Sequence, residues 1–302
     1  MLDILTRAGC FVAIIALGHI LRRTGFFGPE TFGLLSKIVM KITLPAALLA
    51  SAAGKPIDAS LLTISLLGLG GGVLYMGLGW LLQRKGSKQQ QAYFIQNLPG
   101  YNIGTFALPF TQSFLGPVGV LTTSIFDLGN AFICFGGSFS IARAVKEGGK
   151  ADFRRVLKAP LTSLPFLTHA LMVFLNLNHL TPPKAIISFA EIVGGANAFL
   201  AMLMIGVGLN LSADRSKLGA MAKILSVRFG VAAVLALCYY YLLPFDLEVR
   251  QALVILAFSP IGSTVPVYTA ELGEDVGLSS ATNSAAIVIS IVIIVTLLTV
   301  ML

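Results

Sequence analysis

Two segments of the sequence place helix breakers and small polar residues inside long apolar stretches. The first is NLPGYNIGTFALP, from Asn97 to Pro109, and the second is SPIGSTVP, from Ser259 to Pro266. Proline removes a backbone hydrogen-bond donor, and glycine allows the dihedral angles that unwound backbone needs. Irregular backbone at membrane depth survives only where protein or a water-filled cavity surrounds it. Interrupted segments at matching places in two halves of a chain therefore predict a transporter binding site.

The chemistry available there follows from the ends of the broken helices. Free amides at the start of a half-helix favour an anionic group, whereas free carbonyls at the end of one favour a cation or a hydrogen-bond donor. The predicted substrate-binding residues come from the two broken segments and from one matched pair elsewhere: Asn102, Gly104, Thr105, Pro109, Ser259, Pro260, Ser263, Thr264, Pro45 and Asn197. The alternative is a pair of proline kinks that bind nothing.

Asp127 is the strongest single candidate for binding a coupling ion. An acid in the middle of a membrane costs about 2.5–3.5 kcal/mol or more unless it is paired or hydrated. Asn130 lies three residues further along, on the same helix face, and Asn283 is the near-counterpart in the last apolar block. These residues are predicted to bind a sodium ion or carry a proton. A structural acid, hydrogen-bonded to backbone, is the alternative.

Other polar residues carry weaker predictions. Glu191 is expected in solvent near the outer interface, and His169 is expected to be structural. Lys41 is expected to reach toward the membrane surface, with an anion contact as the alternative. The sequence has no metalloprotease, phosphate-loop or nucleophile-elbow motif, and its three cysteines lack metal-ligand spacing. We therefore expect no enzyme activity and no cofactor apart from coupling to Na+ or H+.

The composition indicates a membrane protein. Of the 302 residues, 56% are hydrophobic and 11% are charged, against about 25% charged in soluble domains. Blocks of about 20 apolar residues match a hydrocarbon core of roughly 30 Å, and they lack the alternation of a β-barrel. The net charge of +8 does not indicate nucleic-acid binding, because the basic residues cluster in short loops between blocks. We expect an all-α protein in a lipid bilayer, and its small-residue faces are compatible with a homodimer.

Ten apolar blocks are predicted. They cover residues 4–21, 32–53, 61–82, 92–115, 118–142, 161–177, 185–211, 222–243, 249–272 and 276–302. Lysine and arginine concentrate in the loops after blocks 1, 3, 5 and 7, so the positive-inside rule puts those loops in the cytoplasm and both termini outside. The loop after block 9 is an exception to this pattern of basic loops, since it carries Glu271, Glu274 and Asp275 without a basic residue. The expected location is the inner (plasma) membrane, crossed many times.

Weak internal repeats divide the chain into two halves. Gly116 matches Gly273 at an offset of 157 positions, and the region around Pro45 matches the region around Asn197 at an offset of 152. These matches predict a first repeat over residues 1–142, a cytoplasmic linker over 143–160 and a second repeat over 161–302. With five spans in each half, the second repeat enters from the opposite side of the membrane, as in many secondary transporters.

Three segments resemble the auxin efflux carrier family of bacterial and plant transporters. They are ITLPAALL from Ile42 to Leu49, NIGTFALP from Asn102 to Pro109, and DLGN from Asp127 to Asn130. The resemblance implies two inverted five-helix halves, a scaffold from blocks 1, 2, 6 and 7, and broken blocks 4 and 9 that cross. It implies that Asn102, Pro109 and Pro260 lie at this crossover and that the substrate is a small organic anion such as auxin, malate or malonate.

The leading hypothesis is a secondary transporter that moves a small organic anion by alternating access. Within transport, a sodium-coupled symporter of the bile-acid type or a cation/proton antiporter is the alternative, because the same architecture occurs in both. From another class, a membrane receptor that binds a ligand without moving it is the rival hypothesis. The substrate, the direction of transport and the coupling ion stay open at this stage.

Overall fold

The computed structural model describes residues 2–52, 59–210 and 215–302, and in these ranges the chain contains helices and no strand. The predicted ends of the second and seventh blocks, at residues 53 and 211, lie outside the described residues. The α-helices are α1 (Leu2–Arg23), α2 (Thr31–Ile38), α3 (Leu44–Ala52), α4 (Ile64–Leu82), α5 (Lys88–Asn97), α6 (Leu108–Phe132), α7 (Ser138–Glu147), α8 (Phe153–Lys158), α9 (Leu164–Leu177), α10 (Lys184–Gly195), α11 (Asn197–Gly208), α12 (Leu218–Leu242), α13 (Leu247–Ala257), α14 (Val265–Glu271) and α15 (Val276–Met301). The all-α prediction is thus confirmed for the described part of the chain.

Many of these helices suit a bilayer. Seven helical stretches of the described residues are long and apolar enough to cross a membrane, and an eighth is added if the bent pair α8–α9 counts as one span. Their exposed surface is apolar, as on Leu66 in α4, Phe189 in α10 and Val292 in α15. Exposing such side chains to water costs free energy, whereas exposing them to lipid does not. These features are typical of a multi-pass membrane protein.

One of the seven stretches is two helices folded against each other. It runs for 45 residues, from Ile103 to Glu147, and a straight helix of that length would extend for about 67 Å. Gly116 interrupts it with a left-handed φ of 58°, directly before Pro117. Thr123 then donates a hydrogen bond of 2.9 Å to Thr111, twelve residues earlier, which a continuous helix cannot bring together. The chain therefore reverses direction at Gly116.

Glycine allows two pairs of helices to approach very closely. A Cβ atom at Gly129 of α6 would lie 2.8 Å from the carbonyl carbon of Ser65 in α4. A Cβ atom at Gly206 of α11 would lie 2.9 Å from the carbonyl carbon of Ile15 in α1. Both distances are shorter than real side chains show, so these positions need glycine. In α4 itself, Gly68 packs against the backbone of Phe126 in α6.

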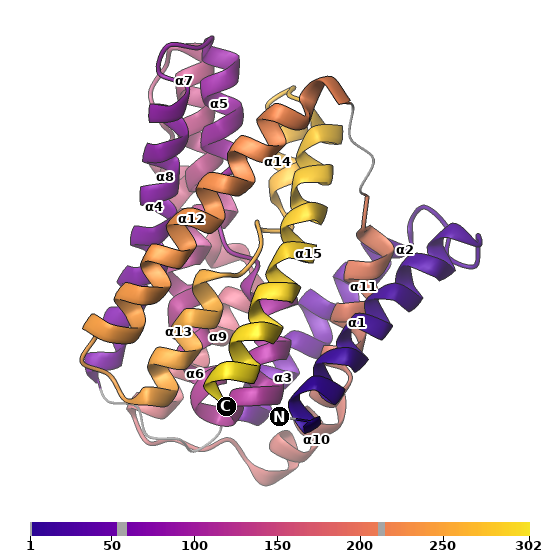
Figure 1. The fold of residues 1–302 in the computed structure, drawn as a ribbon. Helices are drawn as coiled ribbons and strands as arrows, with labels where there is room; N and C mark the ends of the chain where they lie inside the picture. Colours follow the sequence, from indigo (N-terminus) through magenta and orange to yellow (C-terminus); the bar gives the residue numbers. More distant parts are fainter. Residues whose placement is uncertain (1, 53–58, 211–214) are drawn as a thin grey trace.

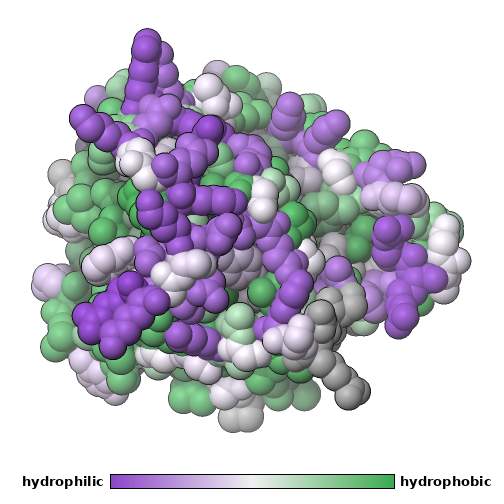
Figure 2. Space-filling model, turned by 90° about the horizontal axis from the view of Figure 1, so that it is seen from above, coloured by the Kyte–Doolittle hydropathy of each residue, from purple (hydrophilic) through white to green (hydrophobic). Residues whose placement is uncertain are grey.

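The charged loops gather at one end of the molecule. The view from above shows hydrophilic residues spread across this end, where α5, α7 and the start of α12 lie (Figure 2). Helix α1 begins and α15 ends at the opposite end (Figure 1). The acidic loop after α14 belongs to the charged end, and each of its acids pairs with a basic residue of another segment: Glu271 with Arg155 (3.1 Å), Glu274 with Lys146 (2.6 Å) and Asp275 with Lys217. The acidic loop, which was the exception to the pattern of basic loops, is thus surrounded by basic residues.

Asp275 also caps the long helix α15. Its carboxylate accepts a hydrogen bond of 2.9 Å from the amide of Leu278, in the first turn of that helix. This bond, with the nearby Lys217 ammonium, holds the pKa of the Asp275 carboxyl below its usual value. The ionised carboxylate therefore stabilises the start of α15.

Candidate functional site

The two broken segments cross and are joined by their backbones. Helix α5 ends at Asn97 and the helix resumes at Ile103, while α13 ends at Ala257 and α14 begins at Val265. At the crossing, the amide of Asn102 donates a hydrogen bond of 2.9 Å to the carbonyl of Pro260. The unwound stretches predicted from proline and glycine therefore meet in the interior of the protein.

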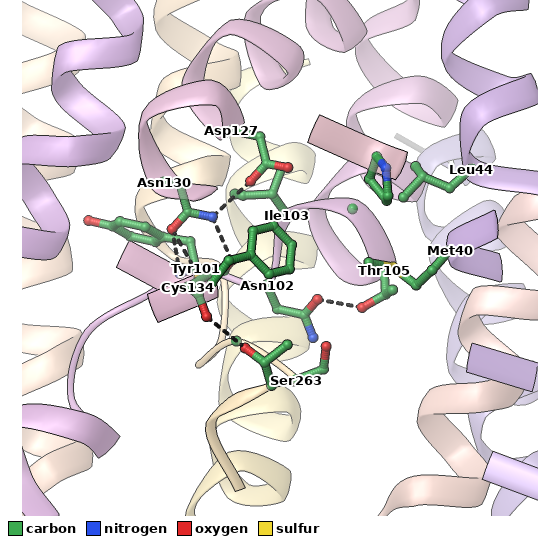
Figure 3. Close-up of a pocket in the computed structure, with 15 residues that line it drawn as sticks. Met40, Leu44, Tyr101, Asn102, Ile103, Thr105, Asp127, Asn130, Cys134 and Ser263 are labelled. Atoms are coloured by element: carbon green, nitrogen blue, oxygen red, sulfur yellow. Dashed lines mark hydrogen bonds between the residues drawn. The ribbon is translucent and has the colours of Figure 1, made fainter. Parts of the chain in front are cut away.

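The side chain of Asn130, in α6, holds one of these unwound stretches in place. Its Oδ1 accepts from the amide of Tyr101 at 3.0 Å, and its Nδ2 donates to the carbonyl of the same residue at 3.0 Å. The side-chain amide thus satisfies both backbone groups of Tyr101, which a continuous helix would have paired internally. Figure 3 shows these bonds beside Asp127 and Cys134.

A small cavity, here called the polar cavity, lies beside the crossing. It has a volume of about 40 Å³, which holds roughly one water molecule. Its lining comes from both breaks and from the helices around them: it includes Asn102, Thr105, Asp127, Asn130, Ser263 and Thr264. The hydroxyl of Thr105 donates to Oδ1 of Asn102, so the amide nitrogen of Asn102 is left as the donor of that side chain.

Three π-helical stretches of the described residues converge on the polar cavity. They run over Val39–Thr43, Ile103–Ala107 and Ile133–Gly137. Each contributes lining residues, among them Met40 from the first and Cys134 from the third. A π-helical turn widens the helix and loosens its hydrogen bonding, and such turns occur often at functional sites. The cavity therefore lies where three helices depart from regular geometry together.

Asp127 reaches the polar cavity and has two side-chain partners. Nδ2 of Asn130 donates to its Oδ1 at 2.8 Å, and Nε2 of His169 lies 3.2 Å from its Oδ2. The histidine contact has the distance of an ion pair but not the geometry of a hydrogen bond. The Asp127 side chain is 14% exposed and that of His169 is fully buried. Asp127 is therefore paired with two side chains at the edge of the polar cavity.

A larger cavity, here called the upper cavity, adjoins the crossing on the side of the charged end. Its volume is about 320 Å³, within the range of small-molecule sites. Asn102 and Ser263 line both cavities and so connect them. The other polar lining residues of the upper cavity are Arg22, Asn210, Ser280, Asn283 and Ser284. Arg22 lies in the last turn of α1 and places a positive charge on this cavity.

The structure brings most of the predicted site residues together. Those that line the polar cavity are Asn102, Gly104, Thr105, Ser263, Thr264, Asp127 and Asn130. Pro260 lies at the crossing itself through its carbonyl, and Ser259 is buried there without lining the cavity. Asn283 lines the upper cavity, and its amide lies 3.5 Å from the carbonyl of Gly262.

Three further predicted residues lie away from the crossing and outside both cavities. Pro109 is in the first turn of α6, and Pro45 is inside α3. Asn197 is fully buried and accepts a hydrogen bond of 3.0 Å from Thr43, which links the two segments that the repeat had matched. Glu191 is exposed, as expected. The exposed Lys41 lines a third cavity of about 490 Å³, between the π-helical stretch of residues 39–43 and the start of α9.

Two residues at the crossing were not predicted from the sequence. Arg228 lies in the middle of α12, 1% exposed, and donates to carbonyls of both broken segments. Tyr101 packs between Arg228 and the polar cavity. Arg228 was detectable, because an arginine five residues past Lys223 is too far into the apolar block to reach the membrane surface easily.

Compared with models of known protein families and with curated protein sequences, the chain matches none. The likeness to the auxin efflux carriers therefore remains a resemblance carried by the three short segments.

Proposed function

We propose that this protein is a secondary transporter of a small organic anion. The observation that carries the proposal is the crossing of two unwound helices, bonded from Asn102 to Pro260, beside the polar cavity. Unwound helices at membrane depth are the usual binding elements of secondary transporters.

The proposed topology has ten crossings in two inverted halves. The reversal at Gly116 turns the longest helical stretch into two crossings, and α5 and α13 each continue into a second short helix beyond their breaks. Gly116 and Gly273, which the repeat matches, both have a left-handed φ, of 58° and 67°. In this proposal the crossing helices form the moving part. The scaffold consists of α1, α2, α3, α9, α10 and α11.

The site suits an anion with hydrogen-bond acceptors. Asn102 and Ser263 offer side-chain donors where the two cavities join, and Arg22 supplies a positive charge to the upper cavity. The upper cavity has room for a small carboxylate, whereas the polar cavity holds roughly one water molecule. We place the substrate in the upper cavity with its anionic end toward Asn102, in a state open toward the charged end.

Asp127 and His169 are the proposed coupling groups. Nε2 of His169 lies 3.2 Å from the Asp127 carboxylate, so a small rotation of either side chain would let a proton pass between them. Asp127 also lines the polar cavity, which has room for roughly one water molecule. A sodium ion bound by the Asp127 carboxylate is the alternative. In either case Asn130 positions the carboxylate through its bond of 2.8 Å.

The test is uptake of labelled dicarboxylates and indole acids into proteoliposomes, with sodium and pH gradients imposed separately. We expect one gradient to drive accumulation of the labelled substrate, and we expect Asp127→Asn to abolish this gradient-driven accumulation. Asp246→Asn is the matched control, because Asp246 is exposed at the start of α13. The control should transport as the wild type does.

Each outcome separates the proposal from its rivals. Accumulation driven by one gradient establishes a coupled transporter and names its ion. Saturable binding without accumulation, by protein shown to be folded and inserted, supports the membrane receptor instead. Accumulation that Asp127→Asn leaves unchanged keeps transport but removes Asp127 as the coupling group.

A further inference from the structure

Arg228 is the largest fully buried side chain of the described residues, and it is a charged one. It lies ten residues into α12, a continuous helix, with 1% of its surface exposed. Burying a guanidinium in the middle of a membrane protein is costly unless its donors and its charge are compensated. Within the described ranges, no acidic side chain lies at ion-pair distance from Arg228. The compensation therefore comes from other groups.

Those groups are the carbonyl ends of both broken helices. Nη1 of Arg228 donates to the carbonyl of Leu98 at 2.7 Å, directly after α5. Nη2 donates to the carbonyls of Ser259 at 2.8 Å and Pro260 at 3.1 Å, directly after α13. The last carbonyls of a helix lack partners and carry its partial negative charge. One guanidinium thus neutralises the negative ends of two helices that come from opposite directions.

Two tyrosines hold the guanidinium at this place. Its central carbon lies 5.1 Å from the ring centre of Tyr75 and 5.2 Å from that of Tyr101, distances typical of cation–π contacts. The hydroxyl of Tyr75 also donates to the backbone carbonyl of Arg228 at 2.9 Å. Both rings are almost completely buried. The side chain is therefore fixed by contacts on its faces as well as by its hydrogen bonds.

Carbonyl groups at the ends of unwound half-helices are ligands that transporters use for a co-transported cation. We propose that Arg228 is a tethered cation that occupies this position permanently, so that no sodium ion binds to the carbonyl side of the crossing. Arginine stays charged at every physiological pH, and its covalent attachment prevents its release. Its transport consequence rests on the proposed function with a proton as the coupling ion: uptake of the anion is then independent of sodium.

The first experiment measures stability and needs no substrate. The apparent melting temperature of the purified protein in detergent should be the same in sodium chloride and choline chloride. Arg228→Ala should lower it by about 5–10 °C, because the buried carbonyls of Leu98 and Ser259 lose their charged donor and that of Pro260 keeps only the amide of Asn102. Low concentrations of guanidinium chloride should restore part of this loss, and urea, which has a similar shape but no charge, should not.

Arg250 provides the matched control. It donates to the carbonyl of Tyr240 at 2.7 Å and lies 5.7 Å from that tyrosine ring, so it resembles Arg228 chemically. It is partly exposed, near the start of α13 and away from the crossing. Arg250→Ala should lower the melting temperature less and show no response to guanidinium.

Arg228→Lys and Arg228→Met keep the proposal testable if Arg228→Ala does not fold. Lysine keeps the charge and methionine removes it at similar volume, so the lysine variant should stay closer to the wild type. The proposal is overturned if Arg228→Met melts as the wild type does, if the two variants lose equal stability, or if sodium stabilises the wild type relative to choline. Proteoliposome uptake that needs sodium would overturn the transport consequence, whereas absence of any uptake would count against the transport function alone.

Discussion

Asn130 is the position where a single substitution should best reveal how the unwound backbone is held. Its side chain, 2% exposed, bonds both backbone groups of Tyr101 at 3.0 Å and also bonds Asp127 at 2.8 Å. In Asn130→Ala, the buried amide of Tyr101 loses its partner. The carbonyl of Tyr101 loses the Asn130 donor but keeps the amide of Ile103 at 3.0 Å and the thiol of Cys134 at 3.8 Å. The substitution therefore removes the support of the break without touching either broken helix.

The magnitude follows from the hydrogen bonds that Tyr101 loses. The Tyr101 amide, left buried without a hydrogen bond, costs about 1–3 kcal/mol, and the one bond lost at the Tyr101 carbonyl, which keeps other donors, costs about 0.5–1.5 kcal/mol. The polar cavity, of about 40 Å³, lies beside them and has room for roughly one water molecule, which can satisfy one of the two groups. We therefore expect Asn130→Ala to cost about 2–4 kcal/mol, or roughly 5–12 °C in melting temperature.

The assay is thermal unfolding of the detergent-solubilised protein, which does not depend on the proposed transport. Asn178→Ala is the control, because Asn178 is exposed at the end of α9 and its side chain bonds only the carbonyl of Phe174, at 2.8 Å, among the bonds described for it. It should change stability by no more than about 0.5 kcal/mol. If Asn130→Ala has the same melting temperature as this control, the side chain does not support the break and the reasoning is refuted. Asn130→Asp should show an intermediate loss, because it keeps the acceptor for Tyr101 but brings a second carboxylate beside Asp127.

Three further predictions concern helix packing, the upper cavity and the charged end. Gly129→Ala should cost at least about 1–3 kcal/mol by forcing α4 and α6 apart, whereas Gly70→Ala, which has open space around it, should stabilise α4 by up to about 1 kcal/mol; thermal unfolding of both variants checks this. Arg22→Gln should raise the KM for an anion in the uptake assay, whereas Arg23→Gln should leave it unchanged, since only Arg22 lines the upper cavity. Asp275→Ala should cost about 1 kcal/mol at neutral pH through the lost helix cap. Because the folded state lowers the pKa of Asp275, its ionised form stabilises the fold above the ordinary carboxyl value of about 3.9, and this part is lost as pH falls through the lowered pKa. The difference in melting temperature between Asp275→Ala and the wild type should therefore shrink in acid; a constant difference would show that the carboxylate charge contributes nothing.

The sequence predicted which residues meet at the crossing wherever the signal was local. Asn102, Ser263 and Thr264 were predicted from the breakers beside them, and Asp127 from the cost of an acid inside an apolar block. All four line the polar cavity. The signal was reliable because proline, glycine and an intramembrane acid each have a direct physical consequence within a few residues of the chain.

Residues that act over long distances in the sequence were harder to predict. Asn283 was grouped with Asp127 from its place in the repeat, but it lines the upper cavity instead. Arg228 was overlooked because its partners, the carbonyls of Leu98 and Ser259, are backbone groups 130 and 31 positions away. Every residue has a backbone carbonyl, so the residue types alone do not indicate which carbonyl accepts such a bond.

The sequence by itself therefore determined that the chain is helical and suited to a membrane, where its helices break, and which polar residues lie near the breaks. These properties depend on hydropathy and on local backbone preferences, which each segment carries on its own. Only the tertiary structure decided that the two breaks cross and that His169 pairs with Asp127. It also decided that the side chains of Asn130 in α6 and Arg228 in α12 bond the free backbone groups at the breaks. Those contacts join segments from distant parts of the chain, and they exist only because the packing of whole helices brings their buried polar groups within hydrogen-bond distance.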